Sequence, residues 1–142
     1  MLQLLVLAAT VGALSIGSNS AQAIPPKVAI PVTNVSPVDG KQMFLSYCSP
    51  CHGRDGRGGG PLASDLQSQP ADLTRIARNN AGRFPESQVV SVLESGAASS
   101  GKHASQMPAW GPVFARISHL SPNDRDLRIL NLIRYLESIQ AR

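Results

Sequence analysis

Two cysteines followed directly by a histidine constrain this chain more than any other feature. They lie in the run Cys48-Ser49-Pro50-Cys51-His52, and the 142-residue chain holds no further cysteine. A disulfide across so short a loop would close little chain entropy and contribute little stability. C-x-x-C-H is instead the attachment pattern of c-type haem, in which two thiols add to the two vinyl groups of one porphyrin. The pattern predicts covalent haem, with Nε2 of His52 as an axial iron ligand.

Other uses of the cysteine pair fit the sequence less well. A thioredoxin-type redox pair follows a strand in a βαβ unit, and no strand pattern precedes Cys48. A zinc site needs about four ligands, and only His103 and His119 remain as further partners. A plain disulfide is the third alternative. Haem attachment explains the histidine as well as the thiols.

A second axial ligand for the iron is expected from Met107, which begins the run MPAWGP. A thioether on an irregular loop can reach the distal side of a haem, and it favours ferrous iron, which raises the reduction potential. His103 and His119 are the rival ligands, although a lone histidine is more often structural or exposed. Met43 lies about one helical turn before Cys48, so we expect it in the core.

The first 23 residues have the pattern of an export signal. The apolar run at 2–14 is too short to span a bilayer at about 1.5 Å per residue, and an A-x-A cleavage pattern ends at Ala23. We expect cleavage after Ala23, so that the mature chain begins at Ile24 in the periplasm or another exported location. No Lys or Arg precedes the apolar run, so retention as a membrane anchor is the alternative. Export agrees with haem attachment, which is carried out on translocated chains.

The mature chain is predicted to be all-α, with long loops. Prolines make 24–38 an extended lead-in, and 39–142 is assigned to one domain, which suits its length. Apolar residues at helical spacing make the last helix, which follows Ser121-Pro122-Asn123-Asp124, the clearest element. The other expected helices cover 40–51 with Asp39 as N-cap, 71–79, and 85–94, where Gly96 ends the helix; the expected loops cover 53–61 and 97–114.

The composition limits the classes of ligand that this chain is expected to bind, and it indicates what fills part of the core. Aromatic residues are only 4% of the chain, so a flat porphyrin would account for part of the interior. The formal net charge is +4, but the Lys and Arg are dispersed and few aromatics lie among them, which argues against nucleic acid. The run from Gly96 to His103 nearly matches a phosphate-binding loop, yet it ends in His and follows a predicted helix. We therefore expect no nucleotide site.

These motifs together make the chain similar to the class I cytochromes c. Gly40 and Phe44 stand before Cys48 as in the first helix of that family, and the segment 132–136 resembles its last helix. The resemblance covers residues 39–139. It consists of five elements in the family's order: a glycine-aromatic helix, C-x-x-C-H, a glycine-proline loop, Met-Pro, and a closing aromatic helix.

The resemblance implies an all-α cytochrome c fold of three to five helices wrapped around one haem c. It implies that the first and last helices cross, with Gly40 and Phe44 meeting Leu132 and Tyr135. It also implies two supporting contacts. The carbonyl of Pro61 would accept the Nδ1–H of His52, and the indole N–H of Trp110 would reach a haem propionate.

With both axial positions filled, the expected function is one-electron transfer and not enzymatic catalysis. We expect a monomeric carrier between periplasmic or membrane-bound redox enzymes, with the membrane involved only if the N-terminal segment is retained. A dedicated haem subunit of one dehydrogenase or oxidase is an alternative. A haem-based sensor or peroxide-reacting protein is another, and it requires Met107 to be absent from the iron. A docking surface for an acidic partner could be framed by Arg54, Arg57, Arg75, Arg78 and Arg83.

Overall fold

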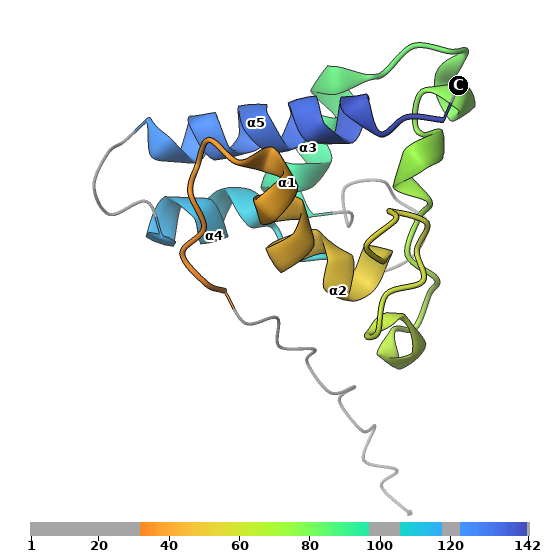
Figure 1. Cartoon of the computed structure of the whole chain (residues 1–142), viewed down its shortest axis with the longest axis horizontal. Helices are drawn as coiled ribbons and strands as arrows, with labels where there is room; N and C mark the ends of the chain where they lie inside the picture. The colour runs from red at the N-terminus through yellow and green to blue at the C-terminus, as the bar shows by residue number, and fades with distance from the viewer. Residues whose placement is uncertain (1–31, 97–105, 118–122, 142) are drawn as a thin grey trace, which may run out of the picture.

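A long C-terminal helix organises the structure, a computed structural model that describes residues 32–96, 106–117 and 123–141. Within these ranges the chain forms five α-helices and no strand, so the predicted all-α class is confirmed. Helix α5 (Asp124–Ser138) packs against α1 (Gly40–Met43), α3 (Glu86–Ser95) and α4 (Trp110–Ile117) (Figure 1). The segment between α2 and α3 has only short 3-10 turns and lies at one end of the molecule, beside the C-terminus.

The first helical stretch runs from Gly40 to the predicted ligand His52 without a break, although it changes its winding. Asp39 caps it as predicted, because its Oδ1 accepts the N–H of Gln42 at 2.9 Å. A π-helical segment, η1 (Phe44–Cys48), separates α1 from α2 (Ser49–His52). Such segments are frequent at functional sites. Here it leads directly into the paired cysteines.

The crossing of the first and last helices is confirmed. A side chain at Gly40 would overlap the carbonyl of Asn131 and come within 3.1 Å of the Cβ of Tyr135, so only glycine permits this approach. The Phe44 and Tyr135 rings pack with their centroids 5.2 Å apart. Leu132 is fully buried in the same core. The contact fixes the start of the helix that carries Cys48, Cys51 and His52.

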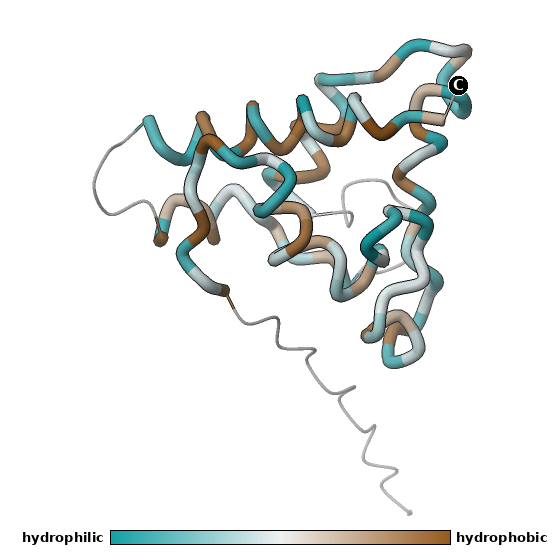
Figure 2. The backbone as a smooth tube through the Cα atoms, in the orientation of Figure 1, coloured by the Kyte–Doolittle hydropathy of each residue, from teal (hydrophilic) through white to brown (hydrophobic). Residues whose placement is uncertain are grey.

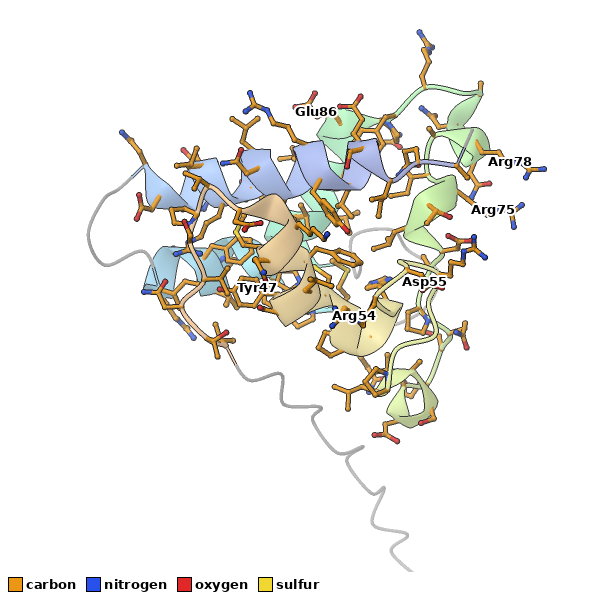
Figure 3. The ribbon with its side chains drawn as sticks, viewed as in Figure 1. Tyr47, Arg54, Asp55, Arg75, Arg78 and Glu86 are labelled. Carbon is orange, nitrogen blue, oxygen red and sulfur yellow. The ribbon has the colours of Figure 1, made fainter. Side chains whose placement is uncertain are left out.

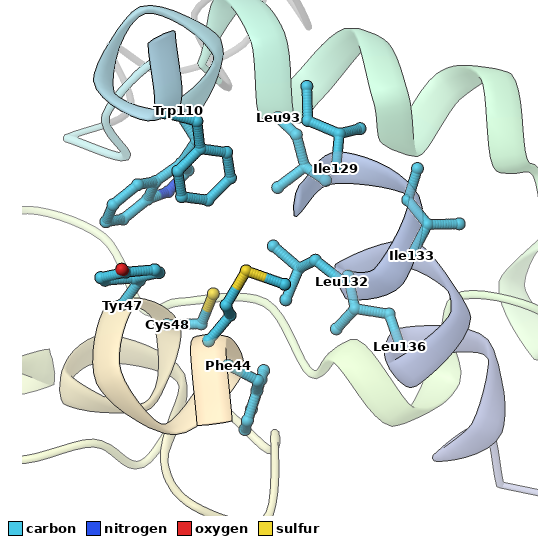
Figure 4. Packing of buried hydrophobic residues seen from close by; sticks show 11 residues of the cluster. Phe44, Tyr47, Cys48, Leu93, Trp110, Ile129, Leu132, Ile133 and Leu136 are labelled. Atoms are coloured by element: carbon cyan, nitrogen blue, oxygen red, sulfur yellow. The ribbon is translucent and has the colours of Figure 1, made fainter. Parts of the chain in front are cut away.

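The core lies between α5 and the other helices. In Figure 2 the hydrophobic positions recur along α5, as its sequence pattern predicts. Tyr47, Trp110 and Phe114 pack together with ring centroids 5.5 to 5.6 Å apart. Figure 4 shows the buried aliphatic side chains of α3 and α5 to one side of Tyr47 and Trp110. The buried apolar residues are Met43, Phe44, Tyr47, Cys48, Leu93, Trp110, Phe114, Ile129, Leu132, Ile133 and Leu136.

The prediction of one helix over 71–79 is wrong. The chain instead forms two 3-10 turns, η3 (Leu73–Arg75) and η4 (Arg78–Asn80). An α-helix would pair the N–H of Ala77 with the carbonyl of Leu73, but both groups bond to the side chain of Gln140 instead. Long-range hydrogen bonds therefore replaced local ones in this segment.

The prediction of a loop over 97–114 is wrong from residue 110 onward, because α4 begins at Trp110. Pro112 lies in the first turn of α4. Backbone N–H groups in the first turn have no partner within the helix, so the missing N–H of proline costs no hydrogen bond there. Residues 97–105 lie outside the described ranges. The predicted helix at 85–94 is confirmed as α3, and Gly96 ends it with a φ of +76°.

The end of the lead-in is bound to the helices. The Tyr47 hydroxyl donates to the carbonyl of Thr33 at 2.5 Å, and buried Arg128 donates to the carbonyl of Val35 at 2.5 Å and to Oδ1 of Asn34 at 3.0 Å. These contacts join residues 33–35 to η1 and α5.

Among the described helices, none has both the length and the apolar character needed to cross a membrane. The predicted cap residues Ser121 and Pro122 lie outside the described residues, and α5 begins at Asp124.

Candidate haem attachment site

The two cysteines lie side by side on the last turns of the first helical stretch as free thiols. Cys48 is buried and Cys51 is partly exposed. Burial is the main cause that raises the pKa of the Cys48 thiol to about 12, and the neighbouring Cys51 contributes to the increase. Burial also raises the pKa of Cys51. Redox-active and zinc-binding cysteines need the opposite, a stabilised thiolate. In the described part of the chain, moreover, no cluster of three His, Cys, Asp or Glu residues could hold a metal ion.

His52 is oriented by one hydrogen bond to the backbone. Its Nδ1 lies 2.9 Å from the carbonyl oxygen of Ala71. Because a carbonyl can only accept, Nδ1 carries the proton and Nε2 keeps its lone pair. Burial lowers the pKa of His52, an effect that the bond to Ala71 opposes. The ring is therefore neutral at pH 7, which is the form that binds iron.

The structure corrects the expected partner of His52, which is the carbonyl of Ala71 and not that of Pro61. The glycine-rich loop folds back along α2, so that Gly58 donates its N–H to the His52 carbonyl at 2.7 Å and Leu62 donates to the Pro50 carbonyl at 2.8 Å. Pro61 is left exposed on the outside of this turn. The chain reaches the imidazole only ten residues later, at Ala71. An alanine side chain gives no sequence signal that its backbone carbonyl binds a histidine.

Glycine is required where this loop touches the attachment segment. The N–H of Gly60 donates to the Cys51 carbonyl at 3.0 Å, and a Cβ at Gly60 would lie 2.6 Å from the Cys51 carbonyl carbon and overlap the Pro50 carbonyl. Any side chain would push the loop away from α2. The adjacent Gly59 is exposed, and a methyl group added there would meet no atom within 4 Å.

Met107 lies on the segment that enters α4. It is partly buried and packs against the hydrophobic core. Its backbone is held close to the end of α3, since a Cβ at Gly96 would come within 2.9 Å of the Met107 carbonyl oxygen. The rival ligands His103 and His119 lie outside the described residues. Met43 is fully buried, which confirms its predicted place in the core.

One hydrogen bond joins the Met107 segment to the histidine side of the site. The backbone N–H of Gln67 donates to Oε1 of Gln106 at 2.6 Å. Gln67 belongs to the stretch that leads from the glycine-rich loop to Ala71. Sequence reasoning missed both glutamines, because a single long-range contact between polar loop residues leaves no periodic or motif signal.

Trp110 is buried at the start of α4, with 3% of its surface exposed. It packs against Tyr47 and Phe114, so its ring belongs to the aromatic cluster, and Figure 4 shows it facing Tyr47. The expected contact between its indole N–H and a haem propionate stays a prediction.

The donor set fits haem c. Cys48 and Cys51 supply two thiols from one helical turn, and His52 presents an imidazole whose Nδ1 is already bonded. The Ala71 hydrogen bond holds the ring in one tautomer, and such a bond also raises the basicity of a ligating imidazole. Bound haem c supplies an iron that accepts or releases one electron.

A separate hollow of about 690 Å³ opens at the start of α3. Arg83, Phe84 and Pro85 are among its lining residues, and none of the lining residues comes from the Cys48–His52 segment or the Met107 segment. We do not assign the cofactor to it.

The candidate docking arginines are all exposed. Arg75 and Arg78 extend outward from the end of the molecule that carries the 3-10 turns, and Arg54 follows α2 (Figure 3). Arg57 has a carboxylate nearby, with its Nε 4.0 Å from Asp55. Basic side chains therefore flank the loop that packs against His52.

Comparison with known proteins gives one family. Residues 36–119 match the family model described as cytochrome C oxidase, cbb3-type, subunit III. Neither a curated protein nor a solved structure matches the chain. The matched range spans more than half of the chain and includes Cys48, Cys51, His52 and Met107. The chain therefore belongs to this family of cytochrome c domains, and it is a c-type cytochrome whose covalently bound haem serves electron transfer.

Proposed function

We propose that this protein is a one-electron carrier that holds a single haem c, with His52 and Met107 as its axial ligands. The observation that carries the proposal is the hydrogen bond between Nδ1 of His52 and the Ala71 carbonyl, next to two free thiols. It leaves Nε2 as the metal-binding atom of the ring. The presence of two cysteines supports the proposal of a single haem, because the C-x-x-C-H pattern uses two thiols for one haem.

The cycle balances with one electron and no proton. His52 and Met107 would hold the haem iron, and a bound haem c would supply a centre that takes one electron from a reduced donor protein and gives one electron to an oxidised acceptor. His52 and Met107 remain in place throughout, because their loops are held by the Ala71 and Gln106 contacts. Little rearrangement accompanies either step, which suits a carrier.

The carrier works outside the cytoplasm in this proposal. The apolar run at 2–14 and the cleavage pattern at Ala23 support export, and haem c is attached to exported chains. Cleavage after Ala23 would release a monomeric carrier into the periplasm. Edman sequencing or intact-mass analysis of the purified protein tests this, since an N-terminus at Ile24 supports cleavage and one at Met1 supports a retained anchor.

An acidic redox protein is the partner that the exposed arginines favour. Arg54, Arg75 and Arg78 place positive charge at the loop end of a chain whose formal net charge is +4. Complementary charge raises the encounter rate and makes it sensitive to salt. Such a transient complex would bury a small interface.

Membership of a terminal-oxidase family favours a second candidate, in which this chain is a haem subunit of an oxidase. The family description names a subunit of cytochrome c oxidase. The two candidates differ in assembly: a carrier purifies alone from native membranes and soluble extract, whereas a subunit stays with a larger complex through mild detergent extraction. Size-exclusion chromatography followed by haem staining separates them.

The first experiment is an absorption spectrum of the purified holoprotein in its oxidised and reduced states. A pyridine haemochrome of haem c, together with the weak far-red band of methionine-bound ferric iron, is the expected result. Haem c without that band would contradict Met107 ligation and favour His103, His119 or an open site. No haem after expression with the maturation machinery would overturn the proposal. Rapid carbon monoxide binding by the reduced wild-type protein would support a sensor or peroxide-reacting protein instead.

Small redox ions test the charge at the exchange surface before a partner is known. Oxidation by ferricyanide should slow as salt rises, because the anion is attracted to positive charge, and oxidation by a cationic cobalt complex should quicken. The double variant Arg75→Glu/Arg78→Glu should flatten both dependences. The matched control Arg116→Glu/Arg134→Glu changes the net charge equally on exposed sites of α4 and α5. Equal effects of the two variants would contradict a localised docking surface.

A further inference from the structure

The C-terminal end of α5 is bound to the segment that supplies the histidine's partner. Gln140 follows α5 and makes three hydrogen bonds: Nε2 donates to the Leu73 carbonyl at 2.8 Å and to the Leu136 carbonyl at 2.7 Å, and Oε1 accepts the N–H of Ala77 at 2.9 Å. The next residue adds a backbone bond, from the N–H of Ala141 to the carbonyl of Thr74 at 2.7 Å.

These bonds act on a short and otherwise irregular stretch. Residues 71–80 contain only two 3-10 turns, and a turn of that length has little stability of its own. Ala71, which accepts the Nδ1–H of His52, stands two residues before Leu73. Leu73 in turn donates its N–H to the Gly56 carbonyl at 2.7 Å. The stretch after Ala71 is thus held by the bond from Leu73 to the Gly56 carbonyl and by the bonds with Gln140 and Ala141.

We propose that Gln140 is a positioning residue for His52: it ties residues 73–77 to the end of α5 and thereby keeps the Ala71 carbonyl on Nδ1 of the haem-ligating imidazole. The inference deepens the proposed function, because it rests on His52 as an axial ligand. A firm Nδ1–H bond makes the imidazole a stronger electron donor, which favours ferric iron and lowers the reduction potential. Gln140 would tune the centre through the short backbone stretch that joins Leu73 to Ala71.

The test uses the holoprotein in its reduced state, in which NMR can follow the Nδ1 proton of His52. Gln140→Ala removes all three side-chain bonds. The exchange of the His52 Nδ1 proton with solvent should quicken, on the order of tenfold, since several bonds each of modest net strength are lost. The reduction potential should rise. The Ala77 amide should lose protection in the same sample, which verifies that the contact is broken.

Ser138→Ala is the matched control. The Ser138 hydroxyl donates to the Tyr135 carbonyl at 2.7 Å, a bond of the same kind at the same helix end that stays within α5. We expect wild-type proton exchange and potential in this variant. Gln140→Glu provides a second arm, because it keeps an acceptor for Ala77 but loses the amide donor to Leu73. Its effect should lie between those of the wild type and Gln140→Ala, and it remains informative if the alanine variant fails to accumulate.

The outcomes separate this inference from the proposed function. Loss of Ala77 protection with an unchanged His52 proton and an unchanged potential would overturn the positioning role while the haem assignment stands. A larger effect of Ser138→Ala than of Gln140→Ala would overturn it too. Absence of His52-ligated haem in the wild-type protein would instead remove the proposed function itself, and the optical spectrum detects that before any variant is made.

Discussion

The side-chain oxygen of Gln106 accepts the backbone N–H of Gln67 at 2.6 Å, and this bond joins the segment that carries Met107 to the segment that supplies the partner of His52. Gln106 directly precedes Met107. Gln67 lies on the stretch that continues to Ala71, the partner of His52. The two residues are far apart in the sequence, so the contact closes a long loop around the site.

Removal of this bond should loosen Met107. In Gln106→Ala the Gln67 N–H loses its acceptor, and a net loss of about 1 kcal/mol would raise the share of molecules with displaced Met107 about fivefold. Carbon monoxide should therefore bind the reduced variant about fivefold faster. Flash photolysis or stopped-flow mixing measures the rate. Gln88→Ala, at an exposed position of α3, is the control. Equal rates in both variants would contradict the role given to Gln106.

Two neighbouring glycines should respond very differently to alanine. Gly60→Ala places a methyl group against the Pro50 and Cys51 backbone and should destabilise the holoprotein by about 2–4 kcal/mol. Gly59→Ala meets no atom within 4 Å and should change stability by less than about 1 kcal/mol. Guanidinium unfolding followed at the haem band, together with the yield of haem-stained protein, compares them. Similar losses in the two variants would argue against close packing of the loop on α2.

Arg128 should contribute to stability through the lead-in. It has 2% of its surface exposed and donates to the Val35 carbonyl and to Asn34. Arg128→Ala leaves these acceptors without their donor and opens a void, so we expect a loss of about 3 kcal/mol in unfolding free energy. Arg134→Ala, at an exposed position of the same helix, should cost less than about 0.5 kcal/mol. Increased proteolysis at residues 32–38 in Arg128→Ala alone would locate the effect.

Asp72 should titrate below the usual aspartate range. The Thr74 hydroxyl, 2.6 Å from Oδ1, is the main cause of the lowered pKa of this carboxyl, and the Thr74 N–H and the charges of Arg75 and Arg57 add to it. The folded chain thus favours the carboxylate. The resulting stabilisation is complete above the ordinary pKa of 3.8 and is lost as pH falls through the lower folded-state value.

Thr74→Val tests this assignment, because it deletes the hydroxyl while the backbone N–H remains. The pKa of Asp72 should rise toward 3.8 in the variant, as followed by carbon-detected NMR of the carboxyl group. An unchanged pKa would assign the effect to the backbone N–H and the arginine charges instead. The same titration on wild type gives the reference value.

Much of the helical framework could be predicted from the sequence. The cap at Asp39, the end of α3 at Gly96 and the burial of Met43 follow from residue type and spacing, and the close crossing at Gly40 follows from the resemblance to the class I cytochromes c. These features depend on neighbours within a few residues or on a glycine that the family pattern marks. Local signals of this kind can be read from the sequence without knowledge of the fold.

The segment 71–80 could not be predicted in the same way. Its composition favours a helix, but its N–H groups bond to Gly56 and Gln140, which lie far away in the sequence. The partner of His52 is missed for the same reason. Every residue, proline included, offers the same backbone carbonyl as Ala71 when the chain passes the imidazole, so the choice depends on the path of the loop.

The sequence by itself therefore determined the covalent chemistry and the family. Cys48, Cys51 and His52 belong to one short motif, and its spacing is set by the reaction of two thiols with one porphyrin, so no tertiary information is needed to recognise it. Only the tertiary structure decided how the ligands are held. The Ala71 carbonyl, Gln106 and Gln140 act through hydrogen bonds between distant segments, and such bonds depend on how the loops pack around α5. Polar residues in irregular segments carry no periodicity, so their pairing became visible only in three dimensions.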